Sequence, residues 1–230
     1  MKELKRERYL SRIRPFYGDS DIIKVLTGVR RSGKSTIMRQ IMAEIGSDAS
    51  GDRALVYIDL DSKKNLKITT PDSLEELIDS EFGNRRGERY LFIDEIQNVR
   101  GFEPLINAYR NDGVSVFITG SNSYFLSGEL VTKLIGRYVE FRIFTFSLGE
   151  VRSFYQENGM DFNPADAFRE YILNGGYPKS FAYADQEDRV LYISSVIDET
   201  IKKDILRNSK VRNRTLLNKL LDYVLSIPGA

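Results

Sequence analysis

The chain has 230 residues, of which 41% are hydrophobic and 29% are charged, so it is long enough for one large folded domain or two modest ones. Its 34 basic and 33 acidic residues nearly balance, so the net charge of +1 does not demand a nucleic-acid partner. Cysteine and histidine are both absent, which excludes disulfides, thiolate nucleophiles, Ser-His-Asp triads and the usual zinc sites. Any catalysis would use carboxylates, lysine, arginine, hydroxyls, amides or an oxygen-bound metal, a set that suits phosphate chemistry.

The sequence has no apolar stretch near the length of a membrane span, and no signal-peptide core follows its basic first residues. We therefore expect a cytoplasmic protein with no membrane partner.

A basic segment, residues 2–14, predicts a helix or arm, and the branched residues of 22–26 then predict a short buried strand. Residues 28–36 read GVRRSGKST and match the pattern G-x-x-x-x-G-K-[ST] without a mismatch. Apolar residues at helical spacing follow over 37–45, so this loop joins a strand to a helix. The context predicts a phosphate-binding loop (P-loop) rather than a chance turn.

The predicted P-loop contains the groups that hold the phosphates of a nucleotide. Its glycines let backbone amides curl around the β-phosphate, and the helix N-terminus adds its dipole. Lys34 would reach the β and γ oxygens, and Ser35 would hold Mg²⁺ through its hydroxyl. The expected cofactor contacts are Gly28, Arg31, Ser32, Gly33, Lys34, Ser35 and Thr36. For the side chains of Arg30 and Arg31, exposure to solvent is favoured over screening of the triphosphate.

Two acids end the third expected strand. Residues 90–94 are apolar up to Asp94, and Glu95 comes next. Because the carboxyl ends of parallel strands face the ligand crevice, Asp94 is expected beside Ser35 in the Mg²⁺ shell. Glu95 is expected to orient and deprotonate a water for attack on the γ-phosphorus. This pair of acids favours hydrolysis over phosphate transfer.

Many loop ATPases insert a strand between the loop strand and the acid strand. The expected strand 54–60 lies between them in the chain and is a candidate for this place. A fourth strand, 114–119, ends in small polar residues. If this strand is the inserted one, Asn122 or a neighbour lies over the γ-phosphate and the attacking water. The alternative for Asn122 is a helix N-cap.

Arg137 precedes the fifth expected strand, 138–144, and follows a helix that Gly136 ends. Within one chain this arginine would lie some distance from the P-loop. Its functional interpretation is an arginine finger that reaches the γ-phosphate of a neighbouring subunit, which would require a homo-oligomer. A cation that interacts with the helix dipole explains it equally well.

The organisation changes near residue 146. Before it, alternating strands and helices predict an α/β P-loop NTPase core, residues 1–146, whose five-stranded parallel sheet lies between helices. After it, the patterns predict helices only. These cover residues 148–155, 164–173, 188–206 and 216–227.

In this order, the P-loop, Asp94-Glu95, the polar tip at 119–122 and Gly136-Arg137 resemble the AAA+ ATPases. The resemblance extends to a prokaryotic group with a DEIQ-type acid motif, an F-S-x-x-E turn and a GGYP element. These motifs stand here at 94–97, 146–150 and 175–178. The resemblance implies that 28–35 is the Walker A motif, Asp94 and Glu95 are Walker B, Asn122 is sensor 1, and Arg137 is the finger.

The resemblance also implies how the chain continues beyond the core. Residues 147–207 would form a small helical lid, in which Tyr177 and Pro178 touch adenine; a helix stop at Gly175 is the alternative for this element. Members of the group continue into an uncharacterised C-terminal region. We therefore expect 208–230 to begin such a helical or winged-helix-like region and to stop part-way into it. No residue is assigned to the second-sensor role, for which Lys179 is too weak a candidate.

The expected function is Mg²⁺-dependent hydrolysis of ATP that couples nucleotide state to a change of shape, with ATP or ADP and Mg²⁺ as cofactors. The alternative is a nucleotide-gated signalling or interaction switch with little intrinsic hydrolysis. An unidentified protein partner is expected. Basic residues over 202–214 give weak support for DNA binding, because acids interrupt the run and a solvated helix face explains it better.

Overall fold

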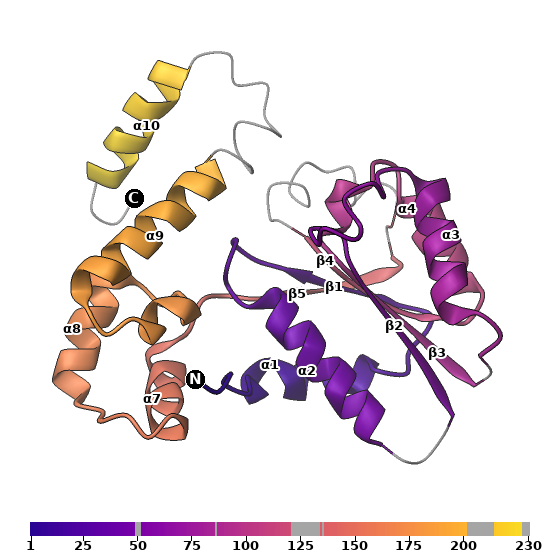
Figure 1. The fold of residues 1–230 in the computed structure, drawn as a ribbon, viewed down its shortest axis with the longest axis horizontal. Helices are drawn as coiled ribbons and strands as arrows, with labels where there is room; N and C mark the ends of the chain where they lie inside the picture. The colour runs from indigo at the N-terminus through magenta and orange to yellow at the C-terminus, as the bar shows by residue number, and fades with distance from the viewer. Residues whose placement is uncertain (49–51, 86, 121–133, 135, 202–213, 227–230) are drawn as a thin grey trace.

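The structure is a computed structural model that describes the chain except for residues 49–51, 86, 121–133, 135, 202–213 and 227–230. Among the described residues, five strands form one parallel sheet in the order β2-β3-β4-β1-β5 (Figure 1). The strands are β1 (Ile23–Thr27), β2 (Arg53–Asp59), β3 (Glu88–Asp94), β4 (Ser115–Thr119) and β5 (Tyr138–Arg142). The predicted α/β class and parallel sheet are confirmed.

The strand between the loop strand β1 and the acid strand β3 is β4, which pairs with both. The interpretation of residues 54–60 as the inserted strand was wrong, because β2 lies at the sheet edge and pairs with β3 alone. Chain order did not reveal this, since a helical crossover can return a strand to either side of its neighbours. The outcome places Thr119, at the end of β4, beside the acid motif.

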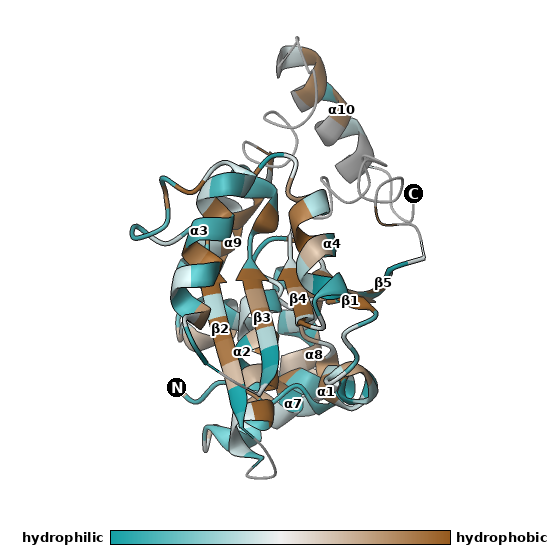
Figure 2. Cartoon of the chain, turned by 90° about the vertical axis from the view of Figure 1, so that its right-hand side faces the viewer, coloured by the Kyte–Doolittle hydropathy of each residue, from teal (hydrophilic) through white to brown (hydrophobic). Residues whose placement is uncertain are grey.

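Helices cover both faces of the sheet (Figures 1 and 2). Helices α1 (Glu7–Ile13) and α2 (Lys34–Ser47) pack on one face, and α3 (Pro71–Phe82) and α4 (Glu103–Asn111) pack on the other. Successive strand residues divide between the two cores because side chains alternate along a strand. Phe92 and Phe117 stack with centroids 4.7 Å apart on the α1–α2 side, whereas Ile93 and Ile118 face α3 and α4.

Local sequence signals set where several helices begin. Thr70 caps α3 in a capping box with Ser73, and Pro71 occupies the first turn, as predicted. Asn163 caps α8 (Pro164–Asn174) through its side-chain oxygen. The described residues of the α/β part also contain two short 3₁₀ helices, η1 (Arg14–Phe16) and η2 (Ile96–Asn98).

After β5 the described elements are all helical. They are α7 (Leu148–Glu157), α8, the 3₁₀ helix η3 (Pro178–Ala182), α9 (Gln186–Thr200) and α10 (Arg214–Ser226). We use "lid" for α7 to α9. Its core contains Phe146, Val151, Phe154, Tyr155 and Phe181, together with Leu4 from the N-terminal segment. The chain therefore begins between the lid and the sheet, where Figure 1 shows the N-terminus beside α7.

None of the helices within the described ranges has the length and apolarity needed to cross a membrane.

Candidate functional site

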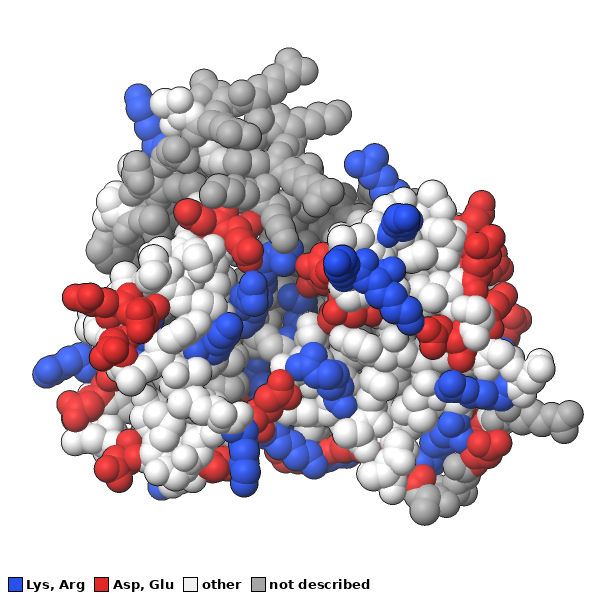
Figure 3. Space-filling view, viewed as in Figure 1, with Lys and Arg blue, Asp and Glu red and all other residues white. Residues whose placement is uncertain are grey.

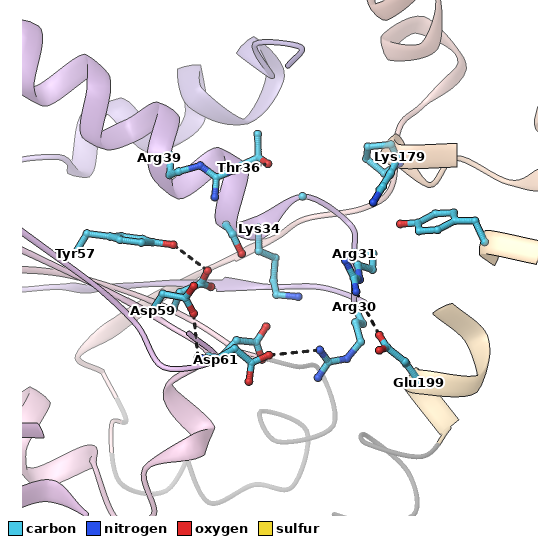
Figure 4. Close-up of a pocket in the computed structure, with 16 residues that line it drawn as sticks. Arg30, Arg31, Lys34, Thr36, Arg39, Tyr57, Asp59, Asp61, Lys179 and Glu199 are labelled. Carbon is cyan, nitrogen blue, oxygen red and sulfur yellow. Dashed lines mark hydrogen bonds and ion pairs between the residues drawn. The ribbon is translucent and has the colours of Figure 1, made fainter. Parts of the chain in front are cut away.

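A cavity of about 430 Å³ lies at the carboxyl ends of the strands, where the lid faces the sheet. Figure 3 shows lysine and arginine side chains gathered along the hollow between the two parts. The P-loop, the ends of β2 and β3, and the lid all contribute side chains to the cavity (Figure 4). The lining combines five basic side chains (Arg30, Arg31, Lys34, Arg39 and Lys179) with five acids (Asp59, Asp61, Asp94, Glu95 and Glu199), so the cavity offers partners both for an anionic ligand and for a cation bound with it.

The P-loop has the backbone that its sequence predicts. Gly33 has φ 102° as the N-cap of α2, and the first turn of that helix holds Lys34, Ser35 and Thr36, all of which line the cavity. An α-helix leaves its first amides without intrahelical acceptors, so this turn can donate to an anion. Gly28 has no room for a side chain, because a Cβ there would lie 2.1 Å from the carbonyl oxygen of Ile143.

Lys34 is 5% exposed, and its ammonium Nζ donates to the carbonyl oxygens of Gly28 (3.0 Å) and Val29 (3.2 Å). These carbonyls hold the charge inside the loop that a phosphate would fill. The loop therefore positions its lysine at the cavity.

Arg30 and Arg31 both line the cavity, so the favoured exposure of their side chains to solvent was wrong for Arg30. The Arg30 side chain is only 14% exposed and lies 3.9 Å from the carboxylate of Asp61. Arg31 is half exposed, has a left-handed backbone with φ 64°, and lies 3.6 Å from Glu199 of the lid. The two arginines therefore face acids that are distant in the sequence, which a local pattern does not reveal.

Asp94 is 3% exposed at the end of β3, and a hydroxyl donates to each of its carboxylate oxygens. Tyr57 of β2 donates to Oδ2 at 3.1 Å, and Thr119 of β4 donates to Oδ1. The two neighbouring strands thus fix the orientation of this carboxylate. Tyr57 was not predicted as a site residue, because the chain does not show that β2 lies beside β3.

Glu95 differs from Asp94 in its backbone, which is left-handed with φ 60°. Its amide donates to Thr119 Oγ1 at 3.0 Å, and its carboxylate accepts from the Gln97 amide. This turn explains how adjacent acids reach different places. Burial raises the pKa of Glu95 above its ordinary value, and the Asp94 charge adds to the rise, although Lys34 opposes it. A raised pKa makes this carboxylate a better proton acceptor.

The lid contributes Pro178, Lys179, Tyr192 and Glu199 to the cavity lining. The Lys179 ammonium lies 5.9 Å from the centroid of the Tyr192 ring. The buried Tyr192 hydroxyl has no hydrogen-bond partner among the described residues. Lys179, too weak a candidate from the sequence, therefore brings a cation to the cavity, opposite Lys34 in Figure 4.

The GGYP element has a structural role, of which the sequence predicted the helix stop at Gly175 as an alternative but not the packing of Gly176. Gly175 ends α8 with φ 67°, which is the helix stop given above as the alternative for this element. Gly176 accepts a hydrogen bond from the Phe146 amide at 2.7 Å, and a Cβ there would lie 2.1 Å from the Phe146 carbonyl oxygen. Pro178 lines the cavity and Tyr177 precedes it, so adenine contact by these two residues stays a prediction.

Two further predicted residues lie elsewhere. Asn122 falls outside the described residues. Arg137 is exposed, and its carbonyl oxygen accepts a hydrogen bond from the Ile23 amide. This contact lies at the amino end of β1, whereas the P-loop follows the carboxyl end of that strand. The expectation that Arg137 lies away from the loop of its own chain agrees with this placement. Its action on a neighbouring subunit stays a prediction.

A metal ion at this site would depend on more than protein carboxylates. Ser35 and Asp94 line the same cavity and offer oxygen donors, which suit Mg²⁺. The described residues contain no group of three or more acids that could hold a metal by themselves. This donor set fits Mg²⁺, which usually takes one or two protein ligands and completes its shell with phosphate oxygens and water.

The sequence profile of the AAA domain family matches residues 20–152, from β1 through the P-loop and the acid motif into α7. The chain belongs to the AAA domain family. A domain of unknown function also matches residues 165–229 of this AAA protein.

Two curated relatives are uncharacterised. The AAA protein is 31% identical to one from Haemophilus influenzae, over 96% of its own length and 55% of the relative. It is 26% identical to one from Methanocaldococcus jannaschii, over 89% of its length and 46% of the relative. The chain thus spans about half the length of these relatives.

Solved structures share the fold at low identity. The Aeropyrum pernix Orc1 protein in complex with DNA has a TM-score of 0.54 at 14% identity, over 96% of this chain and 72% of that one. AMPPCP-bound DnaA from Aquifex aeolicus has a TM-score of 0.54 at 12% identity, over 98% and 69%. The S. cerevisiae Hsp104–ADP complex has a TM-score of 0.54 at 16% identity, over 97% and 38%.

Proposed function

We propose that this AAA protein binds ATP in the cavity between sheet and lid and hydrolyses it with the help of Mg²⁺. One observation carries the proposal: the P-loop lysine, the oriented carboxylate of Asp94 and the more basic carboxylate of Glu95 line the same cavity. A kinase would use the same loop, but the second acid of the pair suits activation of water rather than of a substrate hydroxyl.

The proposal assigns nucleotide binding to both sides of the cavity. The first-turn amides of α2 and the Lys34 ammonium would hold the β- and γ-phosphates, and Arg30, Arg31 and Lys179 add positive charge around them. Two proteins that share the fold were solved with AMPPCP and with ADP, which supports a nucleotide as the ligand. The adenine contact of Tyr177 and Pro178 belongs to the same proposal.

The chemistry divides between the two acids. Ser35 and Asp94 would hold Mg²⁺, which neutralises charge on the phosphate oxygens when it is bound. Glu95 would accept the proton of the attacking water, because its burial keeps its pKa above the ordinary value. Asn122 would orient that water, and Arg137 would act on a neighbouring subunit.

We propose that nucleotide state changes the position of the lid, α7 to α9, relative to the core. We also propose that this movement acts on a protein partner; the chain spans about half the length of its curated relatives. The Orc1 protein, which shares the fold, was solved in complex with DNA. The basic and acidic residues of this chain nearly balance, so we do not propose DNA as its partner.

A variant series tests the assignment of Glu95. Glu95→Gln should bind ATP with near-normal affinity and lose at least about 100-fold in phosphate release, as expected when a general base is removed. Lys34→Ala should lose binding as well. Glu88→Gln is the matched control, since it makes the same change at the other end of β3 and should behave as wild type. Normal turnover by Glu95→Gln would rule out this role.

A further inference from the structure

Arg6 is a buried cation that does not line the cavity described above. It precedes α1 in the N-terminal segment and is only 2% exposed. Its guanidinium carbon lies 4.5 Å from the centroid of the Tyr9 ring and 5.2 Å from the centroid of the Phe146 ring. A buried charge is strongly unfavourable unless it is fully paired, so the partners of this side chain need an explanation.

Each of the five N–H groups of an arginine side chain has an acceptor here. Nη1 donates to the carbonyl oxygens of Ser32 and Phe144, both at 2.9 Å. Nη2 donates to the carbonyl oxygen of Thr145 at 3.3 Å and to Glu150 Oε2 at 3.1 Å, and Nε donates to Glu150 Oε1 at 2.7 Å. One planar group therefore joins the P-loop, the segment after β5 and the lid.

The contact with Ser32 involves a peptide bond of the P-loop. In a trans peptide the carbonyl and the following amide point in opposite directions, so the hydrogen bond to Arg6 turns the Gly33 amide away from it. Gly33 itself lines the cavity and begins the turn that leads to Lys34. Arg6 thus orients part of the phosphate-binding backbone without touching the ligand.

The contact with Glu150 joins Arg6 to the lid. Glu150 is the third residue of α7, and it also accepts from the Ser147 amide at 2.9 Å in the capping box of that helix. Burial alone would raise the pKa of Glu150, but hydrogen bonds from Arg6 and Ser147 outweigh it and lower the pKa. The acid is therefore ionised, and its two oxygens form a bidentate pair with the guanidinium.

The segment between β5 and α7 is held at the same place. The Ile143 amide donates to the Thr27 carbonyl oxygen at 2.7 Å, directly before the P-loop, and the Phe146 amide donates to Gly176 of the lid. A rotation of α7 about this segment would have to change the bidentate pair with Arg6, because the other end of Arg6 is fixed to Ser32.

We propose that Arg6 is a positioning residue that couples the orientation of the lid to the phosphate affinity of the P-loop. The proposal rests on the proposed function, since it requires a nucleotide in the cavity. It predicts that a change in the lid at Glu150, which does not line that cavity, alters nucleotide binding.

The test measures the affinity of mant-ATP and mant-ADP by fluorescence, and phosphate release, for wild type, Arg6→Lys, Glu150→Gln and the double variant. Lysine keeps the charge but cannot form the five-donor fork. Each single variant should weaken nucleotide binding at least about fivefold. The double variant should be no weaker than about the weaker single one, because both changes break one linkage.

Glu170→Gln is the matched control. It removes the charge of an acid paired with the buried Arg189 inside the lid, away from the P-loop. Its affinity should stay within about twofold of wild type. If Glu150→Gln remains folded and its affinity also stays within twofold, the coupling is overturned. Independent, multiplicative effects in the double variant would overturn it as well.

Two further measurements separate the remaining outcomes. Hydrogen exchange on the unaltered protein decides the question if the variants do not fold: ADP should slow exchange over residues 28–36 and 147–151 together, and no change over 147–151 contradicts the coupling. An unaltered protein that binds no nucleotide overturns the proposed function and this inference with it. Normal binding by wild type with unchanged Glu150→Gln overturns the inference alone.

Discussion

The adjacent acids Asp94 and Glu95 reach different places at this site because their backbones differ. Asp94 ends an extended strand and is held by hydroxyls of Tyr57 and Thr119, whereas Glu95 adopts φ 60° and turns away. A left-handed conformation of a residue other than glycine costs energy and persists only where its surroundings hold it, and such residues are enriched at active sites. The order of the two letters in the sequence predicts the pair, but only the fold shows which groups orient each member.

Lys24 provides a residue-scale prediction about stability. It is buried on β1, where Nζ donates to Ser115 Oγ at 2.8 Å, and burial lowers its pKa from 10.5 to about 7. Between pH 7 and 10.5 the unfolded chain keeps the proton that the folded protein has lost, so the free energy of unfolding rises with pH in this window. Below pH 7 both states are protonated and this contribution is constant.

Urea unfolding at pH 6.5 and 8.5 measures this effect. Wild type should gain roughly 1 to 2 kcal/mol relative to Lys24→Met between the two pH values, from about 1.4 kcal/mol per pK unit. The variant provides the reference because it removes only this titration. Identical pH dependence of the two proteins would show that Lys24 stays charged in the fold.

At the scale of elements, the GGYP segment shows how far a motif can be interpreted from sequence. The stop at Gly175 follows from a general rule for helix ends. The need for Gly176 does not, because it arises from the backbone of Phe146, which lies far away in the chain. The same reason hides Arg6 from sequence analysis: the basic residues 2–14 predict a helix or arm, and the pattern does not show that the lid packs against this segment.

Gly176→Ala should therefore destabilise the lid. A Cβ at 2.1 Å from the Phe146 carbonyl oxygen forces backbone to move, and overpacking of this kind typically reduces the free energy of unfolding by about 1 to 3 kcal/mol. Gly46→Ala is the control, because nothing lies within 4 Å of a Cβ in that helical position and alanine favours a helix. Thermal melts that rank Gly176→Ala at or above Gly46→Ala would contradict the packing argument.

At the scale of the whole molecule, the alternation of strands and helices was enough to predict a parallel sheet with helices on both sides. The strand order was not predictable, because it depends on which side of a neighbour each crossover returns. Residues 54–60 and 114–119 were both candidates for the central place, and β4 occupies it. The same holds for the site: the residues within motifs were predicted, whereas the places of Tyr57 and Tyr192 in the site depend on how the elements pack and were not predicted.

A variant of Arg137 can show whether two copies of the molecule form the site together. It lies at the amino end of β5, away from the P-loop of its own chain. If it acts on a neighbour, the specific rate of phosphate release should rise with protein concentration, and Arg137→Ala should remove that rise at a cost of at least about 100-fold. The control is Arg100→Ala, another exposed arginine. A rate independent of concentration and of Arg137 would remove the finger role.

The most direct test of the central claim is a single turnover, with the protein in excess over radiolabelled ATP and Mg²⁺. We predict that wild type converts the bound ATP to ADP and inorganic phosphate in equal amounts, that EDTA prevents this, and that Glu95→Gln holds ATP intact. Recovery of unchanged ATP from wild type after prolonged binding would contradict hydrolysis and would identify the protein as a nucleotide-gated switch.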